Sequence, residues 1–220
     1  MRLLLALLVL ATPLNAETHR AGIFDYYVLS LSWSPNWCAL EGDARNAAQC
    51  DAHAQTGWIL HGLWPQYTRG WPAYCRTAHH APSRSMTAAM ADIMGSSGLA
   101  WHQWRKHGTC SGLSAGSYFA LSREAFARVT LPVILDHKEK PMALSARALR
   151  DAFLEANPGW LADMLAITCR GQHIQEARLC LSRSLDPRPC GADVLRACTL
   201  TAAIVEPVRR RPDPPKAPDD

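Results

Sequence analysis

The sequence predicts a fold of the α+β class on three observations. Residues 27–34 alternate around β-branched and aromatic side chains, which indicates a strand with one buried face. Residues 165–169 and 174–181 have the character of two further strands joined by a turn. Residues 118–129 and 145–157 carry apolar side chains at helical spacing, so they predict amphipathic helices. Because helices and strands do not alternate regularly along the chain, we expect α+β rather than a parallel α/β fold.

Shorter segments lie between these elements. Residues 39–55 are small and polar, which is typical of a loop or a short helix. Residues 56–61 predict a second strand, and residues 66–82 are rich in turn-forming side chains. Residues 85–94 place methionine and isoleucine at helical spacing, and the Gly–Ser stretch 95–98 is expected to end that helix.

The two ends of the chain differ in character from the body. Residues 1–16 have the pattern of a secretory signal peptide, because Arg2 precedes the unbroken apolar run 3–10, which is too short to span a bilayer. Residues 17–205 are expected to form one domain without membrane association. Residues 206–220 contain five prolines and three successive arginines, which predicts a disordered tail. We therefore expect a secreted or periplasmic protein.

Composition narrows the class of protein without naming its function. The 220 residues are 48% hydrophobic, which is enough for a sizeable core. The formal net charge is +4, and +3 once Arg2 leaves with the signal peptide. This mildly basic balance is compatible with a polyanionic substrate but is far from that of a protein that coats nucleic acid.

Eight cysteines behind a signal peptide predict oxidised pairs, hence a disulfide-stapled fold. No CxxC motif is present, which argues against a structural zinc site. Eight cysteines allow many connectivities, so sequence order gives only a preferred set. That set is Cys38–Cys50, Cys75–Cys110, Cys169–Cys198 and Cys180–Cys190.

The stretch 101–110 concentrates side chains suited to proton transfer. If it is helical, His102 lies over Lys106 and Gln103 lies over His107, since residues four apart share a face. Two imidazoles, a fixed positive charge and an amide would then surround one small volume. Ser96 or Ser97 is a candidate cap at the start of this helix, and Gly108 is placed to end it. A solvated helix face is the alternative interpretation.

A third histidine, His61, follows the short apolar run of the second predicted strand. Gly62 and Pro65 are expected to force a turn directly after it. A histidine that projects from the end of a strand beside the aromatic side chain of Trp64 is well placed to face a cleft.

These two segments, ILHGLWP at 59–65 and HQWRKHGTC at 102–110, resemble the two active-site motifs of the ribonuclease T2 family. The resemblance extends over 24–198 and departs from the family at Gln103, where the family usually has glutamate. It implies a central, mainly antiparallel sheet flanked by helices. It also supports the pairing Cys75–Cys110.

The resemblance implies a metal-independent endoribonuclease that cleaves single-stranded RNA. His107 would be the general base and His61 the general acid. Lys106 and Gln103 would stabilise the pentacovalent state, and His102 would bind phosphate. The 2′-hydroxyl would attack to give a 2′,3′-cyclic phosphate, which is later hydrolysed to a 3′-phosphate. No metal or cofactor is expected, and DNA, which lacks the 2′-hydroxyl, should be inert.

Five further side chains are candidates for base recognition. Trp64 matches a family tryptophan that stacks on the base upstream of the cut, and stacking tolerates any base. Gln66 stands where some members have an aspartate that favours adenine, so we expect low base specificity. Trp71 or Tyr74 would form the other wall, and Leu99 would touch the downstream base. Ordinary packing is the alternative for these last three.

Gln103 leaves a second interpretation open. A glutamine cannot titrate, and the loss of one positioned group costs on the order of 10- to 1000-fold in rate, so we expect a slower enzyme whose turnover rises in Gln103→Glu. The alternative is a catalytically impaired RNA- or protein-binding module on the same fold. A metal-dependent hydrolase fits poorly, because the spacing of His102 and His107 differs from the i, i+4 pair of helical zinc sites. We expect a monomer.

Overall fold

A computed structural model describes residues 19–136 and 138–209, and the predicted signal peptide, 1–16, lies outside them. The described residues form a six-stranded sheet in the order β2-β1-β5-β6-β3, with β4 also paired to β5. All strand pairs are antiparallel except β5 with β6, which confirms the predicted α+β fold with a mainly antiparallel sheet. The strands are β1 Tyr26–Trp33, β2 Trp58–Gln66, β3 Met142–Leu144, β4 Leu165–Arg170, β5 His173–Leu181 and β6 Ala203–Val205.

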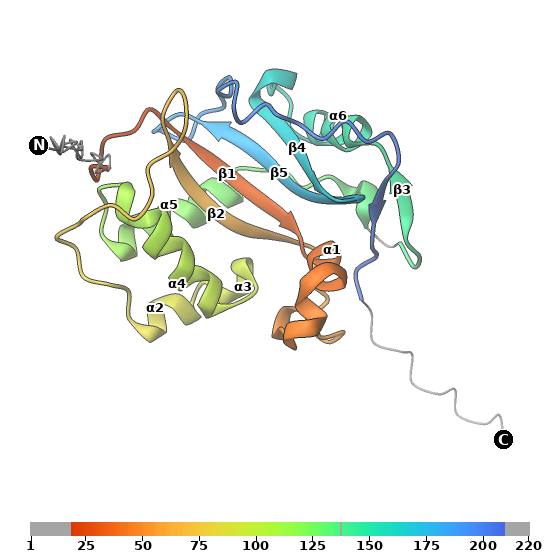
Figure 1. The fold of residues 1–220 in the computed structure, drawn as a ribbon, viewed down its shortest axis with the longest axis horizontal. Helices are drawn as coiled ribbons and strands as arrows, with labels where there is room; N and C mark the ends of the chain where they lie inside the picture. The colour runs from red at the N-terminus through yellow and green to blue at the C-terminus, as the bar shows by residue number, and fades with distance from the viewer. Residues whose placement is uncertain (1–18, 137, 210–220) are drawn as a thin grey trace, which may run out of the picture.

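Helices flank the sheet on two sides. Helices α2 to α5 gather next to β2, and α6 lies beside β4 (Figure 1). None of the helices in the described ranges is both long and apolar enough to cross a bilayer. The α-helices are α1 Ser34–Trp37, α2 Arg84–Ala88, α3 Ala91–Met94, α4 Ser97–Lys106, α5 Ala115–Ala127 and α6 Ala146–Ala156. Short helical turns cover Cys38–Gly42, Asp43–Arg45, Ala48–Cys50, Gly108–Cys110, Val133–Leu135 and Ala162–Met164.

Strand β1 separates two packed faces, because alternate residues of a strand point to opposite sides. One face belongs to the main hydrophobic core, and the other carries a smaller apolar cluster shared with β5 and the loop after it. The core face consists of Tyr27, Leu29, Leu31 and Trp33. The second cluster consists of Tyr26, Val28, Cys180 and Val194. Because both faces are covered, β1 is buried over nearly its whole length.

Strand β2 is longer than predicted. The sequence suggests an end at His61 and a turn at Gly62 and Pro65, but the strand continues to Gln66. Since β2 is an edge strand paired only with β1, a proline without an N–H group does not interrupt the ladder. The predicted turn is therefore wrong, and both halves of the first motif lie on one strand.

The helix ends predicted at Gly95 and Gly108 agree with the structure, and the one difference lies within the helix predicted for 85–94. The predicted helix 85–94 is divided into α2 and α3. Helix α3 ends directly before Gly95, whose backbone has a left-handed conformation (φ +78°). Helix α4 ends at Lys106, before Gly108. Gly108 thus directly follows the C-cap His107, as predicted, and it also permits close packing, since a Cβ atom there would lie 2.5 Å from Trp104 Cε3 and 2.9 Å from Tyr118 Cδ1.

Four disulfides cross-link the described residues, in the set expected from the order of the cysteines. Cys75–Cys110 fastens the end of the second motif to the loop after β2. The other three join neighbouring loops and strand ends: Cys38–Cys50, Cys169–Cys198 and Cys180–Cys190.

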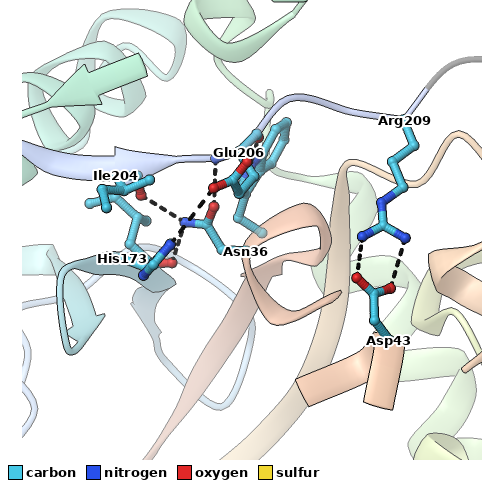
Figure 2. A network of polar contacts seen from close by, with 8 residues as sticks. Asn36, Asp43, His173, Ile204, Glu206 and Arg209 are labelled. Atoms are coloured by element: carbon cyan, nitrogen blue, oxygen red, sulfur yellow. Dashed lines mark hydrogen bonds and ion pairs between the residues drawn. The ribbon is translucent and has the colours of Figure 1, made fainter. Parts of the chain in front are cut away.

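The C-terminal segment stays packed against the body beyond the point predicted for the disordered tail (Figure 2). The backbone N–H of Glu206 donates to Asn36 Oδ1 over 2.6 Å, and Arg209 forms an ion pair with Asp43 at 2.5 Å. These contacts hold the residues that follow β6, so the predicted start of the tail at residue 206 is wrong. The remainder of that segment, 210–220, lies outside the described residues.

Candidate active site

Both histidine motifs line one cavity of about 310 Å³. The first motif enters from β2 and the second from α4 and the residue that follows it. The cavity brings together all five residues predicted to be catalytic: His61, His102, Gln103, Lys106 and His107. Side chains separated by about forty positions in the sequence thus meet, as the two motifs require.

Helix α4 positions the second motif. It begins at the predicted cap, where Ser96 Oγ accepts a hydrogen bond from the backbone N–H of Leu99 over 3.1 Å. His102 and Lys106 are one turn apart on its exposed side, whereas Gln103 is buried. His107 is the C-terminal cap residue and is only 4% exposed. The helix therefore presents the accessible side chains of His102 and Lys106 and the buried amide of Gln103 to the cavity.

A β-bulge positions His61. Ser30 of β1 pairs with Gly62 and Leu31 pairs with Leu60, so His61 is the extra residue between them. Bulges kink a strand and re-aim a side chain, and they are frequent beside active sites. The bulge gives His61 an orientation that a regular strand would not give.

Trp64 lies between His61 and His107. Its ring stacks on His107 with centroids 5.1 Å apart and meets His61 edge-on at 5.3 Å. Its Nε1–H donates to Gln103 Oε1 over 2.7 Å. A Cβ atom on Gly62 would collide with both the Gln103 amide and the Trp64 indole, so a glycine is required at position 62 for this packing.

Burial controls the protonation of His107. Desolvation, followed by the charges of Lys106, His61 and His102, lowers the pKa of His107 from 6.5 to about 3, although Glu176 acts in the opposite direction. The Nδ1 atom of His107 is buried and has no hydrogen-bond partner within the described residues. His107 is therefore a neutral imidazole at physiological pH, able to accept a proton.

The sequence did not single out Glu176, which makes the shortest polar contact in the cavity. Its Oε1 lies 2.6 Å from His61 Nδ1, and its Oε2 lies 2.7 Å from Arg178 Nη2. Burial opposes ionisation of Glu176, but the hydrogen bonds and charges of His61 and Arg178 outweigh it and lower the pKa to about 2. The only available signal was the presence of two charged residues, Glu176 and Arg178, in the strand predicted for 174–181.

The predicted base-recognition residues divide into two groups. Gln66 and the half-exposed Trp71 line the cavity together with Trp64, whereas Tyr74 and Leu99 do not. Leu99 packs against the core. The base contacts predicted for Tyr74 and Leu99 therefore stay predictions, outside the lining of this cavity. Trp64 is already in contact with His107 and Arg178, so Trp71 is the more available aromatic surface.

The cavity does not contain a recognisable metal site. Within residues 19–136 and 138–209, no three His, Cys, Asp or Glu side chains come close enough to ligate one ion. The chemistry available to the described residues is acid–base and electrostatic: a neutral imidazole, a second imidazole paired with a carboxylate, and the Lys106 ammonium.

The chain belongs to the ribonuclease T2 family, whose family model matches residues 24–190. It is 45% identical over 104 residues to a ribonuclease of Aeromonas hydrophila, a match that covers 47% of this chain and 46% of that protein. It is 35% identical over 120 residues to a probable ribonuclease of Haemophilus influenzae, covering 49% of this chain and 44% of the relative. The chain thus spans about half the length of the curated relatives it matches.

Solved structures share the fold at lower sequence identity. The RNase-related protein from Calystegia sepium superposes with a TM-score of 0.64 at 18% identity, covering 85% of this chain and 98% of that chain. Trichomaglin, described as an S-like ribonuclease, gives a TM-score of 0.63 at 21% identity, with 87% and 100% coverage. These likenesses establish that the chain has the ribonuclease T2 fold.

Proposed function

We propose that the protein is a metal-independent endoribonuclease that cleaves single-stranded RNA with low base specificity. The 2′-hydroxyl attacks the neighbouring phosphodiester to give a 2′,3′-cyclic phosphate and a free 5′-hydroxyl. Water then opens the cyclic phosphate to a 3′-phosphate. The observation that carries the proposal is the meeting of His61, Lys106 and His107 in one cavity.

The two imidazoles divide the proton transfers. His107 is the general base that removes the 2′ proton, and its low pKa means that it is unprotonated and ready at neutral pH. His61 is the general acid that protonates the leaving 5′ oxygen. In the hydrolysis step the roles reverse, so His61 activates water and His107 protonates the 2′ oxygen. Each such group contributes about 10²- to 10⁴-fold in rate.

Charge stabilisation falls to the residues of α4. Lys106 supplies a fixed positive charge for the pentacovalent phosphorane, and the amide of Gln103 supplies a hydrogen bond. His102, on the exposed side of the helix, binds a phosphate oxygen. These three groups stabilise developing negative charge without a metal ion.

Low base specificity follows from the chemistry of the cavity wall. Trp71 offers an exposed aromatic face, and stacking accepts every base. Gln66 is buried and its Nε2 donates to the carbonyl of Pro65 over 3.1 Å, so part of its hydrogen-bonding capacity is already used. We infer in addition that the protein acts as a monomer in the periplasm or outside the cell, where its four disulfides are stable.

The test is cleavage of mixed-sequence RNA by the oxidised protein in excess EDTA, with analysis of the product ends. We expect 2′,3′-cyclic phosphate ends that disappear in His61→Ala and His107→Ala. Glu155→Gln, which removes an exposed carboxylate on α6, is the matched control and should cut as the wild type does. Cleavage that requires a divalent metal would overturn the proposal.

Gln103 favours one alternative function, that of an RNA- or protein-binding module that has lost catalytic activity. That alternative predicts a folded wild-type protein that binds single-stranded RNA and never cuts it. Binding retained in His107→Ala, together with uncut RNA in the wild type, would favour it over the enzyme.

A further inference from the structure

Glu176 is a buried carboxylate in direct contact with a motif histidine. Its side chain is only 2% exposed, yet it remains ionised because His61 and Arg178 both hydrogen-bond to it. An ionised carboxylate can only accept hydrogen bonds. His61 Nδ1 must therefore carry a hydrogen and donate it to Glu176 Oε1 over 2.6 Å.

The sheet brings these two residues together across an intervening strand. His61 lies on β2 and Glu176 on β5, with β1 between them (Figure 1). Two strands that flank a third strand lie about 10 Å apart. Their side chains can therefore meet only if the side chains of the strand between them are small. On this face β1 carries Ser32 opposite Glu176 and Ser30 opposite Arg178. These small residues, with the bulge at His61, permit the contact.

The charges around His61 explain why the contact matters. From α4 and its cap residue, His61 is faced by His102, Lys106 and His107, all of which are basic groups. On β5 it faces Glu176, with Arg178 behind the carboxylate. The position where the family usually has glutamate is the neutral Gln103.

The other acid at the cavity, Asp193, is engaged elsewhere. Its Oδ2 accepts the backbone N–H of Gly70 over 2.7 Å, which fixes the loop after β2. Among the described side chains that line the cavity, Glu176 is therefore the carboxylate that contacts an imidazole.

We propose that Glu176 is a positioning residue for His61 and supplies from β5 the negative charge that position 103 lacks. The proposal rests on the ribonuclease function proposed above. Glu176 holds Nδ1–H, so Nε2 is the nitrogen that carries the transferred proton. The imidazolium gives the Nε2 proton to the leaving 5′ oxygen and becomes a neutral imidazole that keeps its Nδ1–H. A histidine is oriented in this way by the carboxylate of a catalytic triad.

The experiment compares Glu176→Gln with the wild type in cleavage of a short RNA, with Glu155→Gln as control. We expect kcat to fall by about 10- to 100-fold with KM changed by less than about 3-fold, since the interaction acts in the transition state. The alkaline limb of the kcat profile should move to lower pH, because a neutral amide no longer stabilises the imidazolium. A folded Glu176→Gln protein with wild-type kcat and an unmoved profile overturns the proposal.

A double-mutant cycle tests whether the two positions share one role. Gln103→Glu should raise kcat in both backgrounds, but by a factor at least about 3-fold larger in Glu176→Gln than in the wild type. An equal factor in both backgrounds contradicts a shared role. Glu176→Asp, which keeps the charge on a shorter side chain, should retain the wild-type pH profile better than Glu176→Gln does.

Nitrogen-15 NMR separates this inference from the proposed function, because it needs no activity. The neutral His61 ring should be protonated on Nδ1 in the wild type and should lose that preference in Glu176→Gln. If the wild type never cuts RNA, the ribonuclease proposal fails. The NMR signals of the His61 ring nitrogens would still show whether Nδ1 donates a hydrogen bond to Glu176. A wild-type His61 ring protonated on Nε2 overturns the positioning role even in an active enzyme.

Discussion

Replacing His107 with glutamine is expected to weaken the dependence of folding stability on pH between 7 and 5. Burial, with the charges of Lys106, His61 and His102, lowers the pKa of His107 from 6.5 to about 3. In the unfolded chain this imidazole takes up a proton below about pH 6.5, whereas in the folded protein it is still neutral at pH 5. The unfolded state then binds more protons, so stability falls as the pH is lowered through 6.5.

The size of the effect follows from the two pKa values. Between pH 7 and pH 5, His107 alone costs the folded state about 2 kcal/mol. Glu176 acts in the same direction, since its pKa is lowered from 4.5 to about 2 and its stabilisation is lost as the pH falls below 4.5. That loss lies below the range measured and is shared by both proteins. The removal of the Trp64 stacking contact is nearly independent of pH and cancels in the comparison.

The assay is urea unfolding at pH 7 and pH 5, followed by circular dichroism with the disulfides intact. Between these two values the wild type should lose about 2 kcal/mol more of its free energy of unfolding than His107→Gln. If the two proteins lose the same amount, His107 titrates near its ordinary pKa in the folded state. Burial would then not keep His107 neutral.

Three further predictions concern the disulfide beside the site, the base platform and the C-terminal segment. Replacing Cys75 and Cys110 together with serine should lower the free energy of unfolding by about 3–4 kcal/mol, since the bridge closes a 35-residue separation, and urea unfolding measures it. Trp71→Ala should raise KM for a short RNA by about 10-fold through lost stacking, while Tyr74→Ala, outside the cavity, leaves KM unchanged; equal effects on KM contradict this. Asn36→Ala should lower the free energy of unfolding by about 2–4 kcal/mol, because Asn36 Nδ2 donates to Ile174 O over 2.7 Å and to Ile204 O over 3.0 Å, and its Oδ1 accepts the N–H of Glu206; a loss below about 1 kcal/mol would count against the network in Figure 2.

Local patterns predicted the longer elements well. The helix 145–157 corresponds to α6, and its predicted cap holds, because Ser145 Oγ accepts the N–H of Ala148 over 3.0 Å. The paired strands β4 and β5 and the turn at Gly171, with φ +56°, are also as predicted. These elements are defined by side-chain periodicity and by one residue with an unusual backbone conformation, both of which are visible in sequence.

The elements that were missed depend on contacts far along the chain. Strands β3 and β6 are three residues each and exist because they pair with each other across about sixty positions. The continuation of β2 through Pro65 depends on its being an edge strand, which sequence periodicity does not reveal. Residues 206–209 are held in place by contacts with Asn36 and Asp43, which are more than 160 positions away.

The candidate site divides in the same way. Its motif residues were found because their types and spacing are rare, whereas Glu176 was missed because its partner lies 115 positions away. The contact depends on a bulge and on two serines of a third strand, none of which has a sequence signature of its own. Tyr74 is exposed and Leu99 packs against the core, which sequence could not show, because an aromatic or apolar side chain near a motif need not belong to a cavity wall.

The most direct test of the central claim uses a DNA oligonucleotide that contains a single ribonucleotide. The account assigns the attack to the 2′-hydroxyl and needs no metal, so the protein in EDTA should cut once, on the 3′ side of the ribonucleotide. It should leave a 2′,3′-cyclic phosphate there, and the all-DNA oligonucleotide should stay intact. Cleavage at deoxyribonucleotide positions, or a cut that leaves a 5′-phosphate, would contradict the account.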